Sequence, residues 1–246
     1  VDGYFKTDEE ARNYKVDQSF VNQMINASAL DNGLHAGDLK FVDLDGNNKI
    51  EQTTSANDRK DMKVIGNSLP RYNYNFGISA DWYGIDFSVL FQGIGKQNWY
   101  PGAETSMFWG PYSRPYASFI PSDFMSQVWS EENTDAYFPR PRGYVALGSN
   151  RELAVVNTKY LQNLAYCRLK NLSIGYTLPN KWLSKIGFEK IRVYFSGENL
   201  LTFTKLHSDY IDPEQASASN SWKTSKSDAN IYPWAKTYSF GVDITF

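Results

Sequence analysis

The 246-residue sequence has little of several residue types on which common functions depend. A single cysteine, Cys167, excludes an internal disulfide and a cysteine-based zinc site. The two histidines, His35 and His207, lie beside no nucleophile motif, so the sequence does not predict an enzyme. The net charge is −2, and without a basic surface we expect no nucleic-acid partner. No run of about 18 apolar residues is present, so no transmembrane helix is expected.

Aromatic side chains, in contrast, are abundant, with 17 Tyr, 15 Phe and 7 Trp. The mean hydropathy is −0.51, a value that looks like that of a soluble protein. That average misleads for a β-barrel, because lumen-facing residues and long outer loops are polar. The chain begins at Val1 with no initiator methionine or signal peptide, as a mature, processed or fragmentary chain would.

Strict two-residue alternation marks residues 236–246. The side chains of one phase are apolar, and they are Tyr238, Phe240, Val242, Ile244 and Phe246. The other phase is polar or small, so the period is that of a strand with two unlike faces. A transmembrane β-strand needs about 9–11 such residues, apolar toward lipid and polar toward a wet lumen. Taken alone, the stretch is equally compatible with the last strand of a soluble sandwich.

Two earlier stretches alternate in the same way and predict hairpins, one over residues 72–93 and one over residues 166–203. The regions 1–71, 94–165 and 204–235 show no such period, and we expect them to be extracellular loops. The connections therefore run long, short, long, short, long, as in outer-membrane barrels with short periplasmic turns. The predicted fold class is all-β: the C-terminal strands of a large antiparallel transmembrane barrel. Five strands cannot close a barrel, so we expect either that this is the tail of a larger chain or that separate partner segments complete the barrel.

A candidate metal-binding loop follows Gly37. Asp43, Asp45 and Asn47 stand at positions 1, 3 and 5 of an EF-hand-like loop, where alternate oxygens converge on a hard cation. Asn48 replaces the usual turn glycine, and Asp58 would have to supply the late carboxylate. The sequence thus suggests a structural Ca²⁺ site, with an Asx-rich turn that holds no metal as the alternative.

Four motifs, in order and spacing, resemble the C-terminal quarter of the SusC/RagA family of TonB-dependent outer-membrane transporters over nearly the whole chain. They are Gly37-Asp38-Leu39-Lys40-Phe41-Val42-Asp43-Leu44-Asp45-Gly46-Asn47 with Asp58-Arg59 and Ile65-Gly66-Asn67; Tyr74-Asn75-Phe76-Gly77 through Phe91-Gln92-Gly93; Arg168-Leu169-Lys170-Asn171-Leu172-Ser173-Ile174-Gly175-Tyr176-Thr177-Leu178-Pro179; and Arg192-Val193-Tyr194-Phe195-Ser196-Gly197-Glu198-Asn199-Leu200-Leu201-Thr202-Phe203-Thr204, ending in Phe246.

The resemblance implies a 22-stranded barrel in the bacterial outer membrane, with an N-terminal plug that this chain lacks. It implies import of oligosaccharides or peptides, driven through TonB, with a SusD-like lipoprotein as the lid. The terminal Phe246 fits the strand signal that is read by the barrel-assembly machinery. None of these expectations requires a cofactor.

Aromatic residues of the region 94–165 are the candidate contacts for substrate or lipoprotein, since aromatic faces can stack on sugars. They are Trp99, Tyr100, Trp109 and Tyr112. The alternative is that these rings only pack the loops together. The alternative function for the whole chain is a soluble β-rich carbohydrate-binding module, which would stay monomeric without detergent.

Overall fold

A computed structural model describes residues 1–21, 33–55, 57–113, 120–141, 143–148, 151–185, 187–219, 226–227 and 232–246. The chain divides into two compact units. The first, here the loop unit, comprises Val1–Asn67, Trp99–Gln162 and Lys223–Asn230. The second, here the sheet unit, comprises Ser68–Asn98, Asn163–Trp222 and Ile231–Phe246. None of the helices in the described part of the chain is both long enough and apolar enough to cross a membrane.

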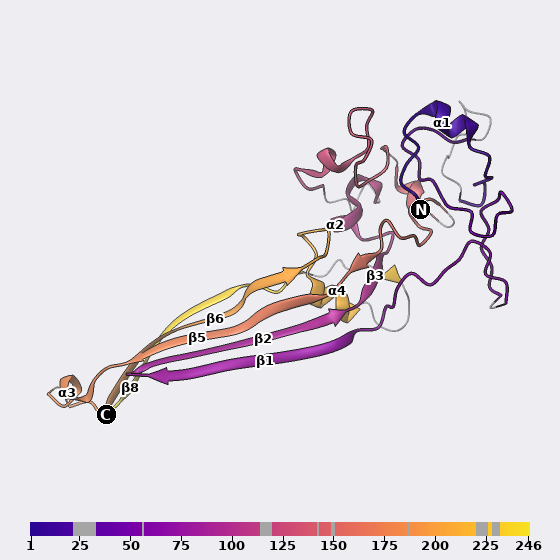
Figure 1. Ribbon diagram of the computed structural model, residues 1–246. Helices are drawn as coiled ribbons and strands as arrows, with labels where there is room; N and C mark the ends of the chain where they lie inside the picture. The colour runs from indigo at the N-terminus through magenta and orange to yellow at the C-terminus, as the bar shows by residue number, and fades with distance from the viewer. Residues whose placement is uncertain are drawn as a thin grey trace. The chain divides into compact units, whose positions relative to one another are not determined.

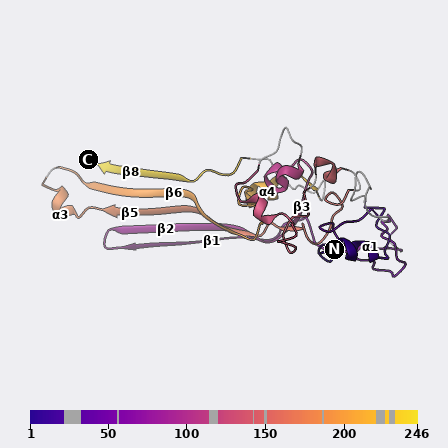
Figure 2. The ribbon, with the colours of Figure 1, turned by 90° about the horizontal axis from the view of Figure 1, so that it is seen from above.

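The sheet unit is built on five long antiparallel strands that lie side by side in the order β1-β2-β5-β6-β8 (Figures 1 and 2). The strands are β1 (Arg71–Trp82), β2 (Ile85–Lys96), β5 (Tyr166–Thr177), β6 (Lys190–Thr204) and β8 (Thr237–Thr245). They fall on the three stretches whose alternation predicts strands: β2 runs three residues further, β1 and β6 one residue further, and β5 and β8 lie within the predicted bounds. The prediction of antiparallel β-structure is therefore confirmed for this unit.

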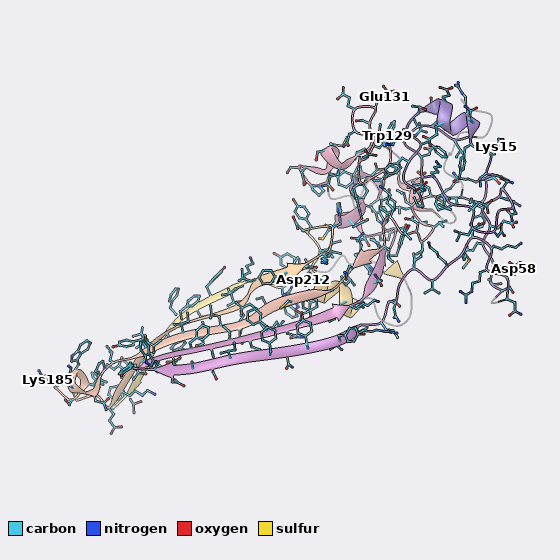
Figure 3. The ribbon with its side chains drawn as sticks, viewed as in Figure 1. Lys15, Asp58, Trp129, Glu131, Lys185 and Asp212 are labelled. Carbon is cyan, nitrogen blue, oxygen red and sulfur yellow. The ribbon has the colours of Figure 1, made fainter. Side chains whose placement is uncertain are left out.

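Short connections join the strands at one end of the sheet. Tyr83 and Gly84 connect β1 to β2, and both have positive φ, 49° and 86°, as a two-residue hairpin turn requires. A Cβ on Gly84 would also lie 2.8 Å from the backbone oxygen of Thr177, so only glycine fits there. The helix α3 (Asn180–Leu183) lies in the turn between β5 and β6, near Lys185 in Figure 3.

The register aligns like side chains in rows across all five strands. One row on the polar face consists entirely of serines, and it runs Ser79, Ser88, Ser173, Ser196, Ser239. The neighbouring row on the opposite face is apolar, and it runs Ala80, Phe87, Ile174, Phe195, Phe240. Because paired residues point to the same side of a sheet, the two faces differ along their whole width.

The apolar face is not the inside of a soluble core. Phe76 is 50% exposed and Phe240 is 83% exposed, and no second sheet covers this face among the residues that the structure describes. A soluble sandwich would bury such side chains between two sheets about 10 Å apart. The structure therefore disfavours the soluble-module alternative, and it leaves an exposed apolar surface of the kind that marks a membrane or partner contact.

A β-bulge in β5 changes which side chains face which way. Leu90 of β2 pairs with Asn171, and the next residue of β2, Phe91, pairs with Leu169, so Lys170 is an extra residue in the register of β5 against β2. In the sequence, Arg168 has the same parity as the apolar residues of this strand. Because of the bulge, Arg168 instead pairs with Gln92 and Thr202 and lies on the polar face.

The loop unit has little regular structure. Its elements are α1 (Asp8–Asn13), β3 (Asn98–Pro101), α2 (Ser106–Trp109), the 3-10 helices η1 (Gly110–Tyr112), η3 (Phe124–Gln127) and η4 (Tyr144–Leu147), β4 (Gln162–Asn163) and β7 (Lys226–Ser227). β3 pairs with β7 in parallel, with Tyr100 opposite Lys226. Thr7 caps α1, since its side chain accepts a hydrogen bond from Glu10 N. Cohesion here comes from buried aromatic rings rather than from a hydrogen-bonded ladder.

Candidate functional site

The polar face of the sheet carries an ion-pair cluster near its short connections. Arg192 of β6 donates from Nε and Nη2 to the two oxygens of Asp86 on β2, over 2.8 and 2.6 Å. Its Nη1 also donates to Asp243 on β8 over 3.2 Å. The guanidinium reaches Asp86 across the intervening strand β5, and it passes over Gly175. One arginine thus links three strands of the polar face.

A larger side chain at Gly175 is expected to displace the ion pair of Arg192 and Asp86, because Arg192 lies over this glycine. A Cβ there would come within 2.4 Å of an Asp86 oxygen and 2.6 Å of Arg192 Nε. We expect Gly175→Val to destabilise the folded sheet by about 1–3 kcal/mol, the usual cost of forcing a group into occupied space. Gly143→Val is the control, since nothing lies within 4 Å of a Cβ at Gly143. Equal denaturant midpoints for both variants, in detergent, would contradict this role of Gly175.

The four predicted contact aromatics lie together in the core of the loop unit. Trp99, Tyr100, Trp109 and Tyr112 are each only 0–1% exposed. The Trp109 ring packs 5.2 Å from that of Tyr160, and its Nε1 donates to Gly102 O over 3.0 Å. The structure brings the four residues together, but it gives their faces no open surface. This arrangement favours the packing interpretation over direct contact with a ligand.

The polar ends of these aromatics are satisfied by backbone oxygens. The hydroxyl of Tyr100 donates to Leu153 O over 2.8 Å, and that of Tyr112 donates to Pro139 O over 2.7 Å. Burial raises the pKa of Tyr100 well above its ordinary value, and it raises the pKa of Tyr137 to about 12. The hydroxyls of Tyr100 and Tyr112 thus join separate stretches of the loop unit.

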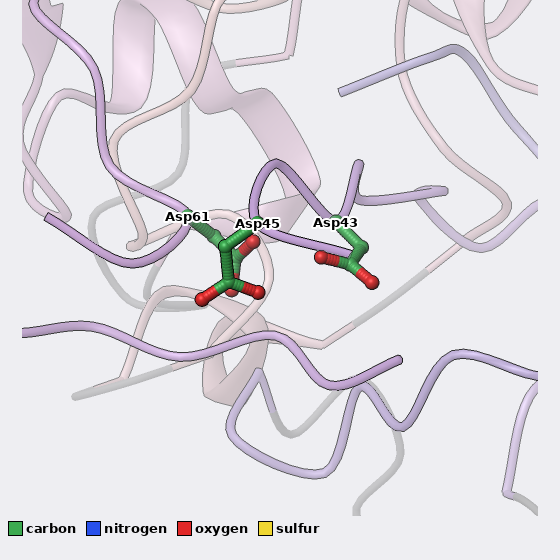
Figure 4. Close-up of side chains that lie close together, drawn as sticks. All are labelled: Asp43, Asp45 and Asp61. Atoms are coloured by element: carbon green, nitrogen blue, oxygen red, sulfur yellow. The ribbon is translucent and has the colours of Figure 1, made fainter. Parts of the chain in front are cut away.

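The candidate metal loop brings three carboxylates together, but they are not the set that the sequence predicts. Asp43, Asp45 and Asp61 each offer an oxygen within 4.8 Å of the others (Figure 4). Asp61 is held in place because its two oxygens accept hydrogen bonds from Leu44 N and Glu51 N, both over 2.7 Å. The 12 positions of an EF-hand loop that starts at Asp43 end before Asp61. Asp61 joins the other two carboxylates because the chain leaves the loop and then returns to it.

Asp58 and Asn47, the other predicted ligands, make other contacts in this structure. Asp58 (Figure 3) forms an ion pair with Lys60 over 3.4 Å and is absent from the carboxylate group. The amide nitrogen of Asn47 donates to Asp45 Oδ2 over 3.2 Å, and its oxygen accepts from Lys49 N. The structure thus brings Asp61, rather than Asp58, close to Asp43 and Asp45, and metal binding at this loop stays a prediction.

The loop geometry favours the ionised form of Asp43. Desolvation raises the pKa of Asp43, but hydrogen bonds from Asn48 N and Gly46 N outweigh it and leave that pKa below its ordinary value. Asn48, which occupies the usual glycine position, has a φ of 61°. Asparagine tolerates this left-handed conformation better than most residues, so the departure from the motif does not prevent the turn.

Beside this loop the loop unit contains a cavity of about 620 Å³. Its lining includes the apolar side chains of Phe41, Ile50 and Met62, together with Asp61 and residues 154–158. None of the four predicted contact aromatics lines it. The cavity therefore does not bring the predicted aromatic site and the carboxylate loop into one site.

The predicted assembly signal, Phe246, follows the last strand. Its side chain is 81% exposed, and its ring lies 5.2 Å from that of Phe188 in the turn after α3. An exposed terminal aromatic is available to another protein, but its recognition stays a prediction.

The sequence matches several known proteins, although no protein-family model matches it. It is 31% identical over 212 residues to the TonB-dependent receptor P3 of Formosa agariphila, which covers 84% of this chain and 19% of the relative. It is 26% identical to the TonB-dependent receptor P26 of the same organism, over 90% of this chain and 21% of the relative. The chain thus spans about a fifth of the length of these relatives.

Solved structures give the same picture of the fold. The RagAB peptide transporter superposes with a TM-score of 0.53 at 24% identity, over 79% of this chain and 19% of that one. The RagAB peptide importer in its closed-closed state gives 0.52 at 20% identity, over 96% and 22%. These names are those of receptors and importers rather than of enzymes. Together with the two-faced strands and the four motifs, these matches place the chain in the SusC/RagA family of TonB-dependent receptors.

Proposed function

We propose that this chain forms part of the wall of an outer-membrane barrel of about 22 strands that imports solutes in a TonB-dependent manner. The observation that carries the proposal is the pair of unlike faces, a row of serines on one side and an exposed row of aliphatic and aromatic side chains on the other. Such faces suit water in a lumen and hydrocarbon outside. The sheet edges at β1 and β8 would pair with the remaining barrel strands, because an unpaired edge is not tolerated in lipid.

We also propose a sidedness for the strands. The turn at Tyr83-Gly84 and the turn that contains α3 would face the periplasm. The regions 1–71, 94–165 and 204–235 would lie on the extracellular side. The support is the difference in length, since barrels of this kind pair short periplasmic turns with long outer loops.

The substrate class proposed is oligosaccharides or peptides, taken up together with a SusD-like lipoprotein. The proposal that peptides are imported is supported by the likeness to RagAB, which is named a peptide transporter. The partner proposal draws on the family resemblance. Energy from the inner-membrane proton gradient would reach the barrel through TonB, which would bind outside the residues of this chain.

An uptake experiment tests the import proposal. Cells that express the full receptor are compared with cells that lack its gene, with fluorescent peptides and oligosaccharides as two separate probes. We expect one probe class to enter only when the receptor is present, and an uncoupler to stop that entry without removing the receptor from the membrane. Uptake that continues in uncoupled cells, or in cells without the gene, would contradict TonB-dependent import.

A second proposal concerns calcium at the loop of Asp43, Asp45 and Asp61. Calcium binds oxygens at about 2.3–2.6 Å, so two of its ligands lie at most about 5 Å apart. The three carboxylates meet this limit, with their oxygens within 4.8 Å of one another. A bound ion would offset the repulsion between three negative charges and would stabilise the loop rather than take part in transport.

The calcium proposal is tested by the thermal stability of the receptor with calcium or with a chelator. Calcium at about a hundred times its dissociation constant should add about 2.7 kcal/mol to the stability of the loop unit. Asp61→Asn should remove this effect, and Asp58→Asn should keep it, because Asp58 pairs with Lys60 instead. If the unmutated receptor shows no dependence on calcium, the site does not exist.

A further inference from the structure

Arg168 is a buried arginine on the polar face of the sheet, and most of its hydrogen bonds go to residues outside the five long strands. It is only 3% exposed, and all three of its described hydrogen-bond partners are side chains. Nε donates to Thr202 Oγ1 on β6 over 2.9 Å. Nη1 and Nη2 donate to Glu214 and Asp212, each over 2.7 Å. Asp212 and Glu214 belong to the long connection between β6 and β8, so Arg168 joins that connection to the wall.

The attachment is reinforced at neighbouring points. Lys170, the bulged residue of β5, donates to both oxygens of Glu214 over 3.1 Å. The backbone N–H of Trp234 donates to Asp212 Oδ2 over 3.2 Å. The same Asp212 caps the helix α4 (Pro213–Ser219), because its Oδ1 accepts from Glu214 N over 2.9 Å. Two cations therefore meet two carboxylates, and both ends of the connection converge on them.

The helix α4 extends this attachment to another strand of the sheet. Ser217 Oγ donates to Gln97 Oε1 over 2.7 Å, and Gln97, just after β2, is fully buried. Ala216 is fully buried, and Ile211 and Leu206 are 4% and 6% exposed. The segment 206–217 thus has a closely packed inner surface. Figure 3 shows Asp212 at the end of the sheet opposite Lys185, away from the short turns.

We infer that Arg168 is a positioning residue that holds the segment 206–217 folded over the polar face, inside the mouth of the pore. The inference rests on the proposed function, because the polar face lines the lumen only if the five strands are part of a barrel wall. The segment would narrow the passage at the level of Arg168, rather than stand free at the rim as an ordinary outer loop. A buried arginine bound to two carboxylates suits this role, because its loss leaves the buried Asp212 without a cation, whereas Glu214 keeps Lys170.

Cysteine labelling of the full receptor in intact cells tests this inference. The parent carries Cys167→Ser, which removes the native thiol, and Ala216→Cys, which reports on the buried side of α4. The probe is a membrane-impermeant maleimide, and the readout is its rate of attachment. We expect slow labelling in the parent, and a rate about tenfold or more higher with Arg168→Met, as opening of a local segment would give. Arg168→Lys should lie in between, because lysine keeps the charge but not the fork of donors.

Arg192→Met is the matched control, since Arg192 lies on the same face and bonds only to Asp86 and Asp243 among the described residues. It should leave the labelling rate unchanged. Folding of each variant is verified by the heat-dependent mobility of the barrel on gels. If Arg168→Met fails to assemble, the pair Asp212→Asn and Glu214→Gln releases the segment without touching β5, and the same rise is expected.

Two results would overturn the inference. Labelling that is fast in the parent would mean that the segment is not held down, and an equal rise with Arg192→Met would mean that Arg168 has no specific role. Failure of the proposed function looks different, because the parent itself would then be missing from the outer-membrane fraction.

Discussion

Phe240→Arg is expected to block assembly of the receptor into the outer membrane, whereas Ser239→Arg is expected to be tolerated. Phe240 lies in the middle of β8, on the apolar face, and its side chain is 83% exposed. A charged side chain that faces lipid near the midplane costs about 2–4 kcal/mol. That is a large share of the stability of a typical domain, which is about 5–15 kcal/mol. Since each 1.4 kcal/mol is a factor of ten, the equilibrium constant for assembly should fall by about one and a half to three orders of magnitude.

The control differs from the variant by one position along the same strand. Ser239 pairs with Ser196 on the polar face, so its substitution by arginine places the same charge at the same depth toward water. The amount of receptor in the outer-membrane fraction, with its heat-dependent gel mobility, measures assembly. Normal assembly of Phe240→Arg, or equal loss in both variants, would show that the two faces do not meet lipid and water.

Trp109→Ala is expected to unfold the aromatic core of the loop unit locally. The indole is fully buried, it packs 4.8 Å from the ring of Phe108, and its removal takes away one of the two donors to Gly102 O, the other being Thr105 N. Truncation of a buried tryptophan costs about 3–5 kcal/mol. Since each 1.4 kcal/mol is a factor of ten, protection of this region should fall by about two to three orders of magnitude.

Hydrogen exchange of peptides from residues 99–160, in the full receptor, measures the effect of Trp109→Ala. Met125→Ala is the control in the same unit, because Met125 is 63% exposed and surface changes usually stay within about 0.5 kcal/mol. If Trp109→Ala left exchange unchanged but abolished uptake of the substrate, the ring would be a ligand contact and the packing interpretation would be wrong.

The strands of this protein were predictable because apolar and polar residues alternate along the sequence of a strand with two unlike faces. Residues 72–82 and 237–245 alternate without exception, and both fold as strands with the expected faces. The hairpin turn was equally predictable, since Tyr83-Gly84 is short and contains the glycine that the geometry requires. These features depend only on neighbouring residues.

What the sequence could not predict depends on residues far apart along the chain. The bulge at Lys170 moves Arg168 onto the polar face, and parity alone gives the opposite face. Asp61 joins Asp43 although 17 residues separate them, because the intervening chain returns to the loop. No local spacing rule encodes either event.

The role of the loop aromatics was open for a related reason. Composition shows that rings such as Trp99 and Tyr112 are present, but burial is a property of the packed unit. A ring that stacks on a sugar and a ring that fills a core have the same sequence signature. The difference appears only when the contacts of Trp109 with Phe108 and Tyr160 are known.

The central claim is that one face of the five strands meets hydrocarbon and the other meets water, and spin labels along β8 test it most directly. Labels are attached one at a time to cysteines introduced at positions 238–244, in a Cys167→Ser receptor in lipid vesicles, and their collision rates with oxygen and with a water-soluble nickel complex are measured. The account predicts that labels at Tyr238, Phe240, Val242 and Ile244 meet oxygen, that those at Ser239, Gly241 and Asp243 meet nickel, and that the two patterns alternate. Collision rates that show no two-residue alternation, or that stay low for both reagents at Phe240, would contradict it.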